Sequence, residues 1–243
     1  MKELHVAVVG DIAWNHDVTP TDDKLSIGGA AYYSSVGAAY FSNQVGVIAR
    51  IGGDFEPSVL KDKGIDIQGL KILPNEKTCR FELVQYTDGN RDFEAFEGVA
   101  SIVDVSIIWL DALSQYKNIS VDSFELYVKQ FPDLTRFMFK RANMIFTNEN
   151  EWQTMKGFGD NFADKPMIIK RGKNGAVYKH FDKEISIPAP QVTAVDFSGA
   201  GDVLAGAFLA LRAQDVPIEI ALRKAVNLAS YSVTKFGVEH IVP

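Results

Sequence analysis

The most constraining stretch of this sequence is a turn rich in small residues that runs directly into an apolar helix. Residues 196–202 read Asp-Phe-Ser-Gly-Ala-Gly-Asp, and residues 203–211 are small or apolar throughout. A helix that is apolar on every side packs inside a protein rather than on its surface. The sequence therefore predicts a buried helix with a tight glycine turn at its N-terminus.

Such a turn favours the binding of an anion. The first amides of a helix have no partner within the helix, and the helix dipole adds partial positive charge at that end. Because Gly199 and Gly201 have no side chains, an anionic group can approach the backbone closely. Asp202 lies at the same place, where a carboxylate can accept the proton of a hydroxyl that attacks a bound phosphate. The structural alternative is that Ser198 or Asp202 only caps the helix.

The same residues carry a family resemblance. Asp-x-Ser-Gly-Ala-Gly-Asp followed by small and apolar residues resembles the C-terminal signature of the ribokinase-like (PfkB-type) carbohydrate kinases. The resemblance implies an anion hole made by Gly199, Ala200 and Gly201, with Asp202 as the catalytic base. This family usually has Thr or Ser at the position of Phe197, so the sequence departs from the pattern there.

Composition limits the possible partners and compartments. With 243 residues the chain is long enough for one sizeable α/β domain, and its net charge of −6 without a basic run argues against a nucleic-acid partner. The single cysteine, Cys79, excludes an internal disulfide and suits a reducing cytosol. No stretch approaches the 18 apolar residues of a membrane span, and we expect a cytoplasmic protein without a membrane partner.

The N-terminal segment predicts the acceptor side of a site. Residues 5–9 form an apolar run that reads as a buried strand and ends at Gly10-Asp11. Ligands of open α/β sheets bind outside the carboxyl ends of the strands, so Asp11, Asn15, His16 and Asp17 are candidate contacts, unless they belong to a solvated loop. The family has an Asp here that binds sugar hydroxyls. Its position corresponds to Asn15, and Asp11 or Asp17 are the alternatives.

Gly28 and Gly29 precede a helix of small residues. Two adjacent glycines at a helix N-terminus let a ligand approach the backbone, and the pair resembles the family signature that lies against the sugar. The usual Asn-x-Ala after it is replaced by Tyr-Tyr-Ser-Ser at residues 32–35. Tyr32, Tyr33 and Trp14 either stack on a nucleobase or belong to the core.

A small sheet is predicted beside this helix. Residues 77–86 alternate, Asp-Gly at 88–89 signals a hairpin turn, and residues 91–96 return. A lone hairpin is marginally stable, so we expect it to join residues 24–27. The resemblance implies a β lid over the sugar, built from about 12–28 and 76–97, which often forms a homodimer interface.

The second half of the chain predicts the nucleotide side. Asn148 and Glu151 follow a strand and begin a helix, where they either contribute to a Mg²⁺ site through oxygen ligands or form a capping box. The pair resembles the family's Asn-x-x-Glu motif. Residues 167–178 read as strand, glycine turn, strand, and resemble the segment that borders the nucleotide phosphates, with Lys170, Gly172 and Gly175. A plain hairpin is the alternative. In the family, the helix around Asn227 flanks the adenine.

The sequence thus predicts a single α/β domain over residues 1–243. Its expected architecture is ribokinase-like: three αβα layers, a mostly parallel central sheet and a small β-sheet lid. The chain has no Gly-x-x-x-x-Gly-Lys-Ser/Thr loop and no Gly-x-Gly-x-x-Gly after the first strand, which excludes a P-loop NTPase and disfavours a dinucleotide site.

The predicted function is ATP-dependent phosphorylation of a hydroxyl on a sugar, nucleoside or polyol. The resemblance implies ATP and Mg²⁺, with a monovalent cation such as K⁺ as a further candidate. The alternative is a catalytically weak ligand-binding or regulatory protein on the same fold, because fold alone does not fix function.

Overall fold

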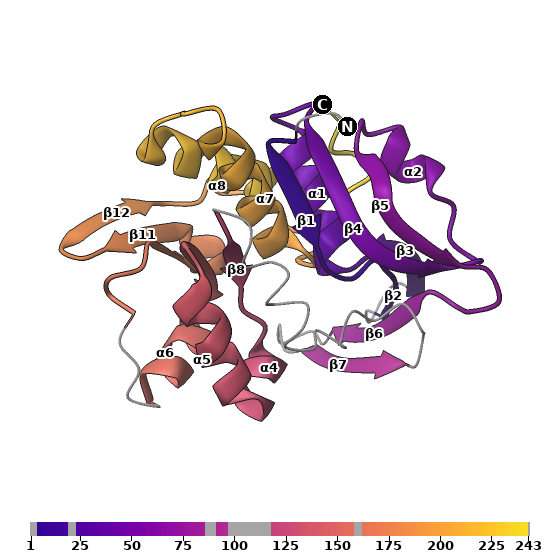
Figure 1. Cartoon of the computed structure of the whole chain (residues 1–243), viewed down its shortest axis with the longest axis horizontal. Helices are drawn as coiled ribbons and strands as arrows, with labels where there is room; N and C mark the ends of the chain where they lie inside the picture. Colours follow the sequence, from indigo (N-terminus) through magenta and orange to yellow (C-terminus); the bar gives the residue numbers. More distant parts are fainter. Residues whose placement is uncertain (1–3, 19–22, 86–90, 97–117, 158–161, 243) are drawn as a thin grey trace.

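Two groups of parallel strands with helices packed against them form the body of the protein (Figure 1). The computed structural model describes residues 4–18, 23–85, 91–96, 118–157 and 162–242. The predicted α/β architecture with a mostly parallel sheet is confirmed, because four of the six strand pairings in the body are parallel.

The N-terminal half supplies a three-stranded parallel sheet with the order β1-β4-β5. Its strands are β1 (Val6–Val9), β4 (Val45–Gly52) and β5 (Asp66–Leu73), and its helices are α1 (Ala30–Ala39) and α2 (Ser58–Lys61). The expected strand is present, but it is only partly buried: Val6 is buried and packs with Ala38 of α1, whereas Val9 is exposed. Successive side chains of a strand point to opposite faces, and α1 covers one of them.

The C-terminal half supplies a five-stranded sheet with the order β12-β11-β10-β9-β8. Its parallel part holds β8 (Ser120–Asp122), β9 (Met144–Asn148) and β10 (Met167–Lys170), and its antiparallel edge holds β11 (Ala176–His180) and β12 (Lys183–Ile187). The predicted strand–turn–strand at 167–178 is confirmed. Its turn is the short 3₁₀ helix Gly172–Asn174.

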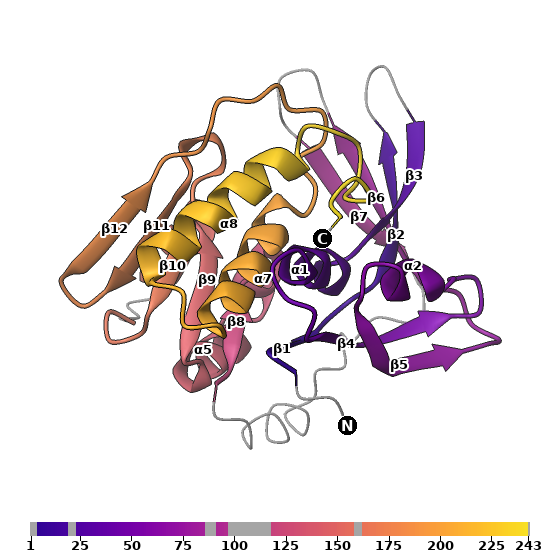
Figure 2. The same cartoon turned by 90° about the horizontal axis from the view of Figure 1, so that it is seen from above.

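Helices cover both faces of this second sheet, which gives three layers (Figure 2). On β9, Ile145 packs into one apolar cluster and its neighbour Phe146 into the other, as the two-residue period of a strand requires. The first cluster includes α4 (Glu125–Gln130), α5 (Pro132–Arg141) and α6 (Glu149–Gly157), and the second includes α7 (Ala200–Arg212) and α8 (Ile218–Ser232).

Helices α1 and α7 approach each other closely because glycines lie where they cross. A Cβ added to Gly206 of α7 would lie 1.9 Å from the carbonyl oxygen of Ser34 in α1. Likewise, a Cβ on Gly37 of α1 would lie 2.3 Å from the carbonyl oxygen of Val203 in α7. The two backbones are therefore in direct contact, which brings both helix N-termini to the same end of the molecule.

A separate four-stranded sheet has the order β3-β2-β6-β7. Its strands are β2 (Ala13–Val18), β3 (Asp23–Gly28), β6 (Cys79–Gln85) and β7 (Arg91–Phe96). The expected turn at 88–89 lies outside the described residues, as do positions 19–22 and 97 of the predicted lid. The strand register joins the two predicted pieces, because β2 pairs with β6 in parallel. The role of this sheet as a lid is a proposal.

The C-terminal segment is tied down by a buried lysine. The Lys63 ammonium donates to the carbonyl oxygens of Ile241 (2.7 Å), Glu239 (3.1 Å) and Val238 (3.4 Å). Burial lowers the pKa of Lys63, and Glu239 acts in the opposite direction. These contacts fix the chain that follows α8 against the turn before β5.

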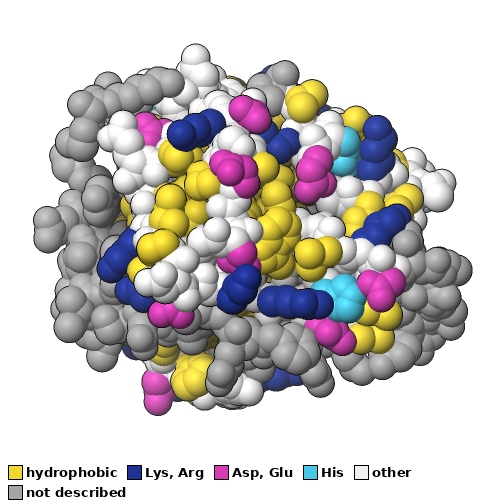
Figure 3. All heavy atoms as spheres, turned by 90° about the vertical axis from the view of Figure 1, so that its right-hand side faces the viewer, with side chains coloured by type: hydrophobic (Ala, Val, Ile, Leu, Met, Phe, Trp, Pro, Cys, Tyr) yellow, Lys and Arg dark blue, Asp and Glu magenta, His cyan; other side chains and the backbone are white. Residues whose placement is uncertain are grey.

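The surface mixes both signs of charge. On the face shown in Figure 3, acidic and basic side chains are interspersed around a strip of hydrophobic ones. None of the described helices is long and apolar enough to cross a membrane.

We predict that Gly206→Ala destabilises the protein by about 1–3 kcal/mol, because an added methyl group forces two packed backbones apart. The matched control is Gly157→Ala in α6, where an added Cβ would have nothing within 4 Å. The control should be neutral or slightly stabilising. Urea denaturation of the three proteins measures the difference, and equal midpoints for both variants would contradict the close α1–α7 contact.

Candidate active site

The glycine turn is organised by the buried carboxylate of Asp196. Its Oδ1 accepts the backbone N–H of Ser198 at 2.8 Å, and its Oδ2 accepts the backbone N–H of Gly237 at 3.0 Å. One side chain thereby fixes the turn internally and joins it to the C-terminal segment. The neighbouring Phe197, where the family usually has a hydroxyl residue, is 62% exposed.

Position 199 requires glycine for two reasons, its backbone conformation and the close approach of the Tyr33 ring. Gly199 caps α7 with φ 69° in the left-handed region, and an added Cβ would lie 2.2 Å from the ring of Tyr33 in α1. Asp202 lies in the first turn of α7. The predicted anion-binding amides of residues 199–201 and the predicted base therefore lie at one helix terminus.

A cation lies beside this terminus. The Lys170 ammonium, at the end of β10, contacts both carboxylate oxygens of Asp122, at 2.6 and 2.8 Å. An added Cβ on Gly201 would lie 3.2 Å from the Lys170 Nζ. Burial lowers the pKa of Lys170, but the carboxylates of Asp122, Asp202 and Glu151 outweigh it, so the pKa is raised and the ammonium stays charged.

Asn148 and Glu151 form the predicted capping box. The Glu151 Oε2 accepts the backbone N–H of Asn148 at 2.9 Å, and the Asn148 Oδ1 accepts the backbone N–H of Glu151 at 2.9 Å. Ser123 and Thr147 also donate hydroxyl groups to Oε2, at 2.5 and 3.3 Å. Burial raises the pKa of Glu151 despite these donors. The pair therefore has a structural role, and its role toward a metal or nucleotide is a separate proposal.

Asn15 of β2, the predicted contact for the phosphate acceptor, faces α1. Its Nδ2 donates to the Tyr33 hydroxyl at 2.9 Å. Within the part of the chain that the structure describes, the Oδ1 of Asn15 is buried and has no hydrogen-bond partner. A Cβ on Gly28 would lie 2.2 Å from the Asn15 amide, so the glycine makes room for this side chain. Gly29, at φ 92°, caps α1.

The two aspartates near Asn15 take different positions. Asp17 is fully buried; its Oδ1 accepts from the Ser198 hydroxyl at 3.5 Å and its Oδ2 from Ser26 at 3.4 Å. Asp17 thus connects β2 to the glycine turn. Asp11 is partly buried, and its carbonyl oxygen accepts the N–H of Ala31 at 2.9 Å.

Two of the predicted nucleotide residues, Gly172 and Gly175, lie in the turn that follows Lys170, and the third, Asn227, lies on α8. Gly172 is exposed in its turn, with φ 54°. Gly175 is buried, with φ 86°, and an added Cβ would lie 2.0 Å from the carbonyl oxygen of Ile187, so both its conformation and its close packing require glycine. Asn227 is exposed on α8.

The suggestion that aromatic residues stack on a nucleobase is not supported for the three named positions. Tyr32 and Tyr33 are 0% and 3% exposed, and Trp14 packs with Phe55 at a ring-centroid distance of 5.7 Å. Tyr32 and Tyr33 are core residues because α7 covers α1, whereas Trp14 of β2 is partly buried and packs against the core. Sequence reasoning missed the contact of Tyr33 with Asn15 and the pairing of Asp122 with Lys170, for which no local motif exists.

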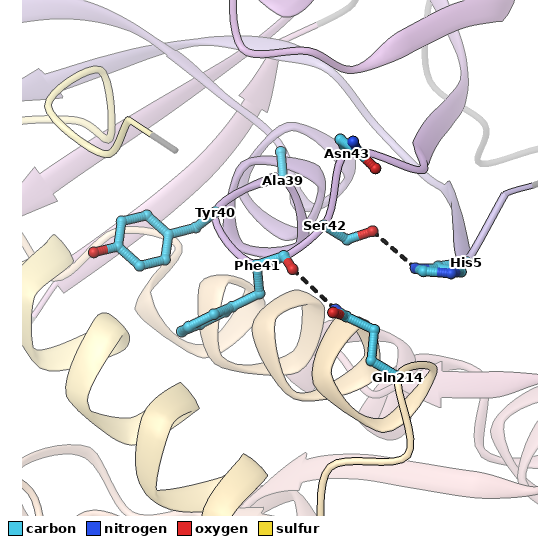
Figure 4. A pocket seen from close by; sticks show the side chains of 7 residues that line it. All are labelled: His5, Ala39, Tyr40, Phe41, Ser42, Asn43 and Gln214. Atoms are coloured by element: carbon cyan, nitrogen blue, oxygen red, sulfur yellow. Dashed lines mark hydrogen bonds between the residues drawn. The ribbon is translucent and has the colours of Figure 1, made fainter.

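A hollow lies beside the C-terminal ends of helices α1 and α7 (Figure 4). It is closed by a contact between His5 Nδ1 and Ser42 Oγ at 3.0 Å and by donation from Gln214 Nε2 to the Phe41 carbonyl at 2.9 Å. The hollow follows the C-termini of α1 and α7, whereas Asp202 and Gly29 lie at their N-termini. It is not part of the candidate active site.

Comparison with known proteins finds a family match and relatives of similar length. Residues 131–243 match the model of the pfkB family carbohydrate kinases. Over 96% of its length the chain is 26% identical to a cytidine kinase of Thermococcus kodakarensis, of which it covers 98%.

Solved structures share the whole fold. A Burkholderia thailandensis nucleoside kinase in complex with inosine superposes with a TM-score of 0.88 at 17% identity, covering 98% of this chain and 93% of that one. A ribokinase from Cryptococcus neoformans in complex with ADP superposes with a TM-score of 0.80 at 18% identity, covering 98% and 96%.

The protein therefore has the ribokinase-like fold of these solved kinase structures. Its C-terminal part, residues 131–243, is similar to the pfkB family carbohydrate kinases.

We predict that Asp196→Asn destabilises the protein by roughly 1–3 kcal/mol, because the amide group can accept only one of the two buried N–H groups and leaves the other unpaired. Asp182→Asn, in the exposed turn between β11 and β12, is the matched control and should be neutral. Thermal unfolding, measured by circular dichroism, compares the stability of the two variants with that of the wild type. An Asp196→Asn protein as stable as its control would show that the carboxylate is not required for the turn.

Proposed function

We propose that the protein transfers the γ-phosphate of ATP to a hydroxyl of a sugar, nucleoside or polyol, with Asp202 as the base. The observation that carries the proposal is the position of Asp202 in the first turn of α7, beside the amides of residues 199–201 and the Lys170 ammonium. A proton acceptor and an anion site are adjacent there, which is what phosphoryl transfer to a hydroxyl needs.

On the phosphate side, Gly199, Ala200 and Gly201 would direct backbone amides at the transferred group. Lys170 would add a positive charge next to Gly201, since Asp122 holds its ammonium there. These groups are in place before the reaction, and such preorganised electrostatic stabilisation is a large source of catalysis. Gly172, Gly175, Asn148 and Asn227 would contact the rest of the nucleotide, which remains a proposal based on the family resemblance.

On the acceptor side, Asn15, Asp11, Gly28 and Gly29 would form the binding surface. The buried Oδ1 of Asn15 is an acceptor without a described partner, which a hydroxyl of the substrate would satisfy. The names of the relatives, a cytidine kinase and a nucleoside kinase with inosine bound, favour a nucleoside as the acceptor.

A magnesium ion fits this site only if the nucleotide supplies some of its ligands. Among the described residues, no group of three or more His, Cys, Asp or Glu could hold a metal. The Glu151 Oε2 already accepts three hydrogen bonds, so Glu151 would reach Mg²⁺ through water, while the phosphates supply direct ligands. Bound there, Mg²⁺ would neutralise charge on the nucleotide phosphates. The proposal for K⁺ rests on the family resemblance alone.

The sheet β3-β2-β6-β7 would act as the lid of a single domain over residues 1–243, with its lid pieces near 12–28 and 76–97. The contact of Asp17 in β2 with Ser198 in the glycine turn supports this role, because it links the sheet to the phosphate site. Closure would exclude water from the transferred phosphate. A homodimer through the lid is part of the proposal.

We predict that Asp202→Asn lowers kcat by about 10²–10⁴-fold, because the amide cannot accept a proton. ATP affinity should change little, since the amides of residues 199–201 and Lys170 remain. The matched control is Asp215→Asn, an exposed residue at φ 59°, a conformation that asparagine tolerates. ADP release is measured with ribose, cytidine, inosine and inositol as acceptors, and ATP binding by calorimetry.

Near-full turnover in Asp202→Asn would refute the base assignment. Absence of turnover in the wild type on every acceptor, with ligands still raising the melting temperature, would instead favour the alternative of a ligand-binding or regulatory protein. The Asn at position 15 and the replaced Asn-x-Ala motivate that alternative.

We also predict that EDTA abolishes turnover and that excess Mg²⁺ restores it, while the folded structure survives because no described metal cluster supports the fold. Circular dichroism of the EDTA-treated protein is the control. Replacing K⁺ by choline at constant ionic strength tests the monovalent cation. Full activity in EDTA would contradict the metal proposal.

A further inference from the structure

Tyr33 lies where the acceptor side and the phosphate side meet. It belongs to the first turns of α1 and is 3% exposed. Its hydroxyl accepts a hydrogen bond from Asn15 Nδ2 at 2.9 Å. Its ring lies against Gly199, whose missing Cβ would come within 2.2 Å of the ring carbons. A single rigid side chain therefore contacts both the proposed substrate residue and the N-cap of the catalytic helix.

The surroundings keep the Tyr33 phenol neutral. Burial raises its pKa well above the usual value, and the nearby carboxylates of Asp196, Asp17, Asp202 and Glu239 raise it further. A neutral phenol can accept one hydrogen bond and donate another. Tyr33 therefore remains a hydrogen-bond acceptor for Asn15 without adding charge to a region already rich in carboxylates.

In this structure the Asn15 amide directs its nitrogen at the Tyr33 hydroxyl. An amide has two donors on its nitrogen and one acceptor oxygen. With Nδ2 directed at Tyr33, the Oδ1 is the atom left without a described partner. Asn15 is thus set to accept a hydrogen bond, and a ligand that satisfies it must present a donor such as a hydroxyl.

We propose that Tyr33 is a positioning residue that couples acceptor recognition to the phosphate site: its hydroxyl orients the Asn15 amide, and its ring supports Gly199. The inference rests on the proposed function and deepens it, because it names what holds the two halves of that site in register. The neighbouring Tyr32 provides the contrast. It is fully buried, yet its hydroxyl has no hydrogen-bond partner in the described part of the chain.

The test compares Tyr33→Phe with Tyr32→Phe. Each variant keeps the ring and removes one buried hydroxyl. Losing the hydrogen bond to Asn15 should raise the KM for the acceptor roughly five- to tenfold, as expected for one neutral hydrogen bond. The kcat and the KM for ATP should change little, since the ring still supports Gly199. Tyr32→Phe should match the wild type in all three constants.

A double-mutant cycle with Asn15→Ala separates coupling from a general structural effect. If Tyr33 acts through Asn15, the Tyr33→Phe substitution should have almost no further effect on the acceptor KM once Asn15 is alanine. If Tyr33→Phe and Asn15→Ala instead raise the acceptor KM by independent factors that multiply in the double variant, the proposal is contradicted. Equal losses in Tyr33→Phe and Tyr32→Phe would also contradict it, as would a fall in kcat without a change in acceptor KM.

Failure of the proposed function is distinguishable from failure of this inference. Wild-type turnover on ribose, cytidine or inosine, lost in Asp202→Asn, establishes the function whatever Tyr33 does. If the wild type turns over none of them, the wild type, Tyr33→Phe and Tyr32→Phe are titrated with cytidine in the absence of ATP. Weaker binding in Tyr33→Phe but not in Tyr32→Phe then supports the coupling, and equal binding or no binding in all variants overturns it.

Discussion

The close contact of α1 with α7 is the constraint on which the rest of the site depends. Gly37 and Gly206 allow two helix backbones to touch, and Gly199 lets the first turn of α7 lie on the ring of Tyr33. Because both helices begin at the same end, the Gly28-Gly29 turn and the 196–202 turn become neighbours. Larger side chains at these positions would separate the helices, and with them the two surfaces that must meet for a hydroxyl to reach a phosphate.

Charge is distributed so that each buried ion has a partner. Lys170 pairs with Asp122 and lies within the field of Asp202 and Glu151, while Asp196 is neutralised by backbone N–H groups rather than by a cation. Buried charges are costly unless they are paired or hydrogen-bonded. Asp202 therefore lies near a cation and in the first turn of a helix, as its proposed role as a base requires.

Several features were predictable because their causes are local. The glycine turn before an apolar helix, the Asn148–Glu151 capping box and the 167–178 hairpin all depend on residues within a few positions of each other. The strand β1 was predicted as buried and is only partly so, since burial depends on which helices cover the strand. The aromatic residues at 14, 32 and 33 could not be assigned from sequence, because packing alone separates a core ring from a stacking ring.

The sequence by itself determined the class of chemistry. A turn of Gly-Ala-Gly with a carboxylate at a helix N-terminus favours anion binding and proton acceptance wherever it occurs, since helix-end amides and side-chain chemistry are local properties. Only the tertiary structure decided how Asn15, Tyr33 and Gly199 come together, and how Lys170 reaches Gly201 while bound to Asp122. Such contacts join residues far apart in the chain, and they follow from the packing of whole helices and strands, which no short motif encodes.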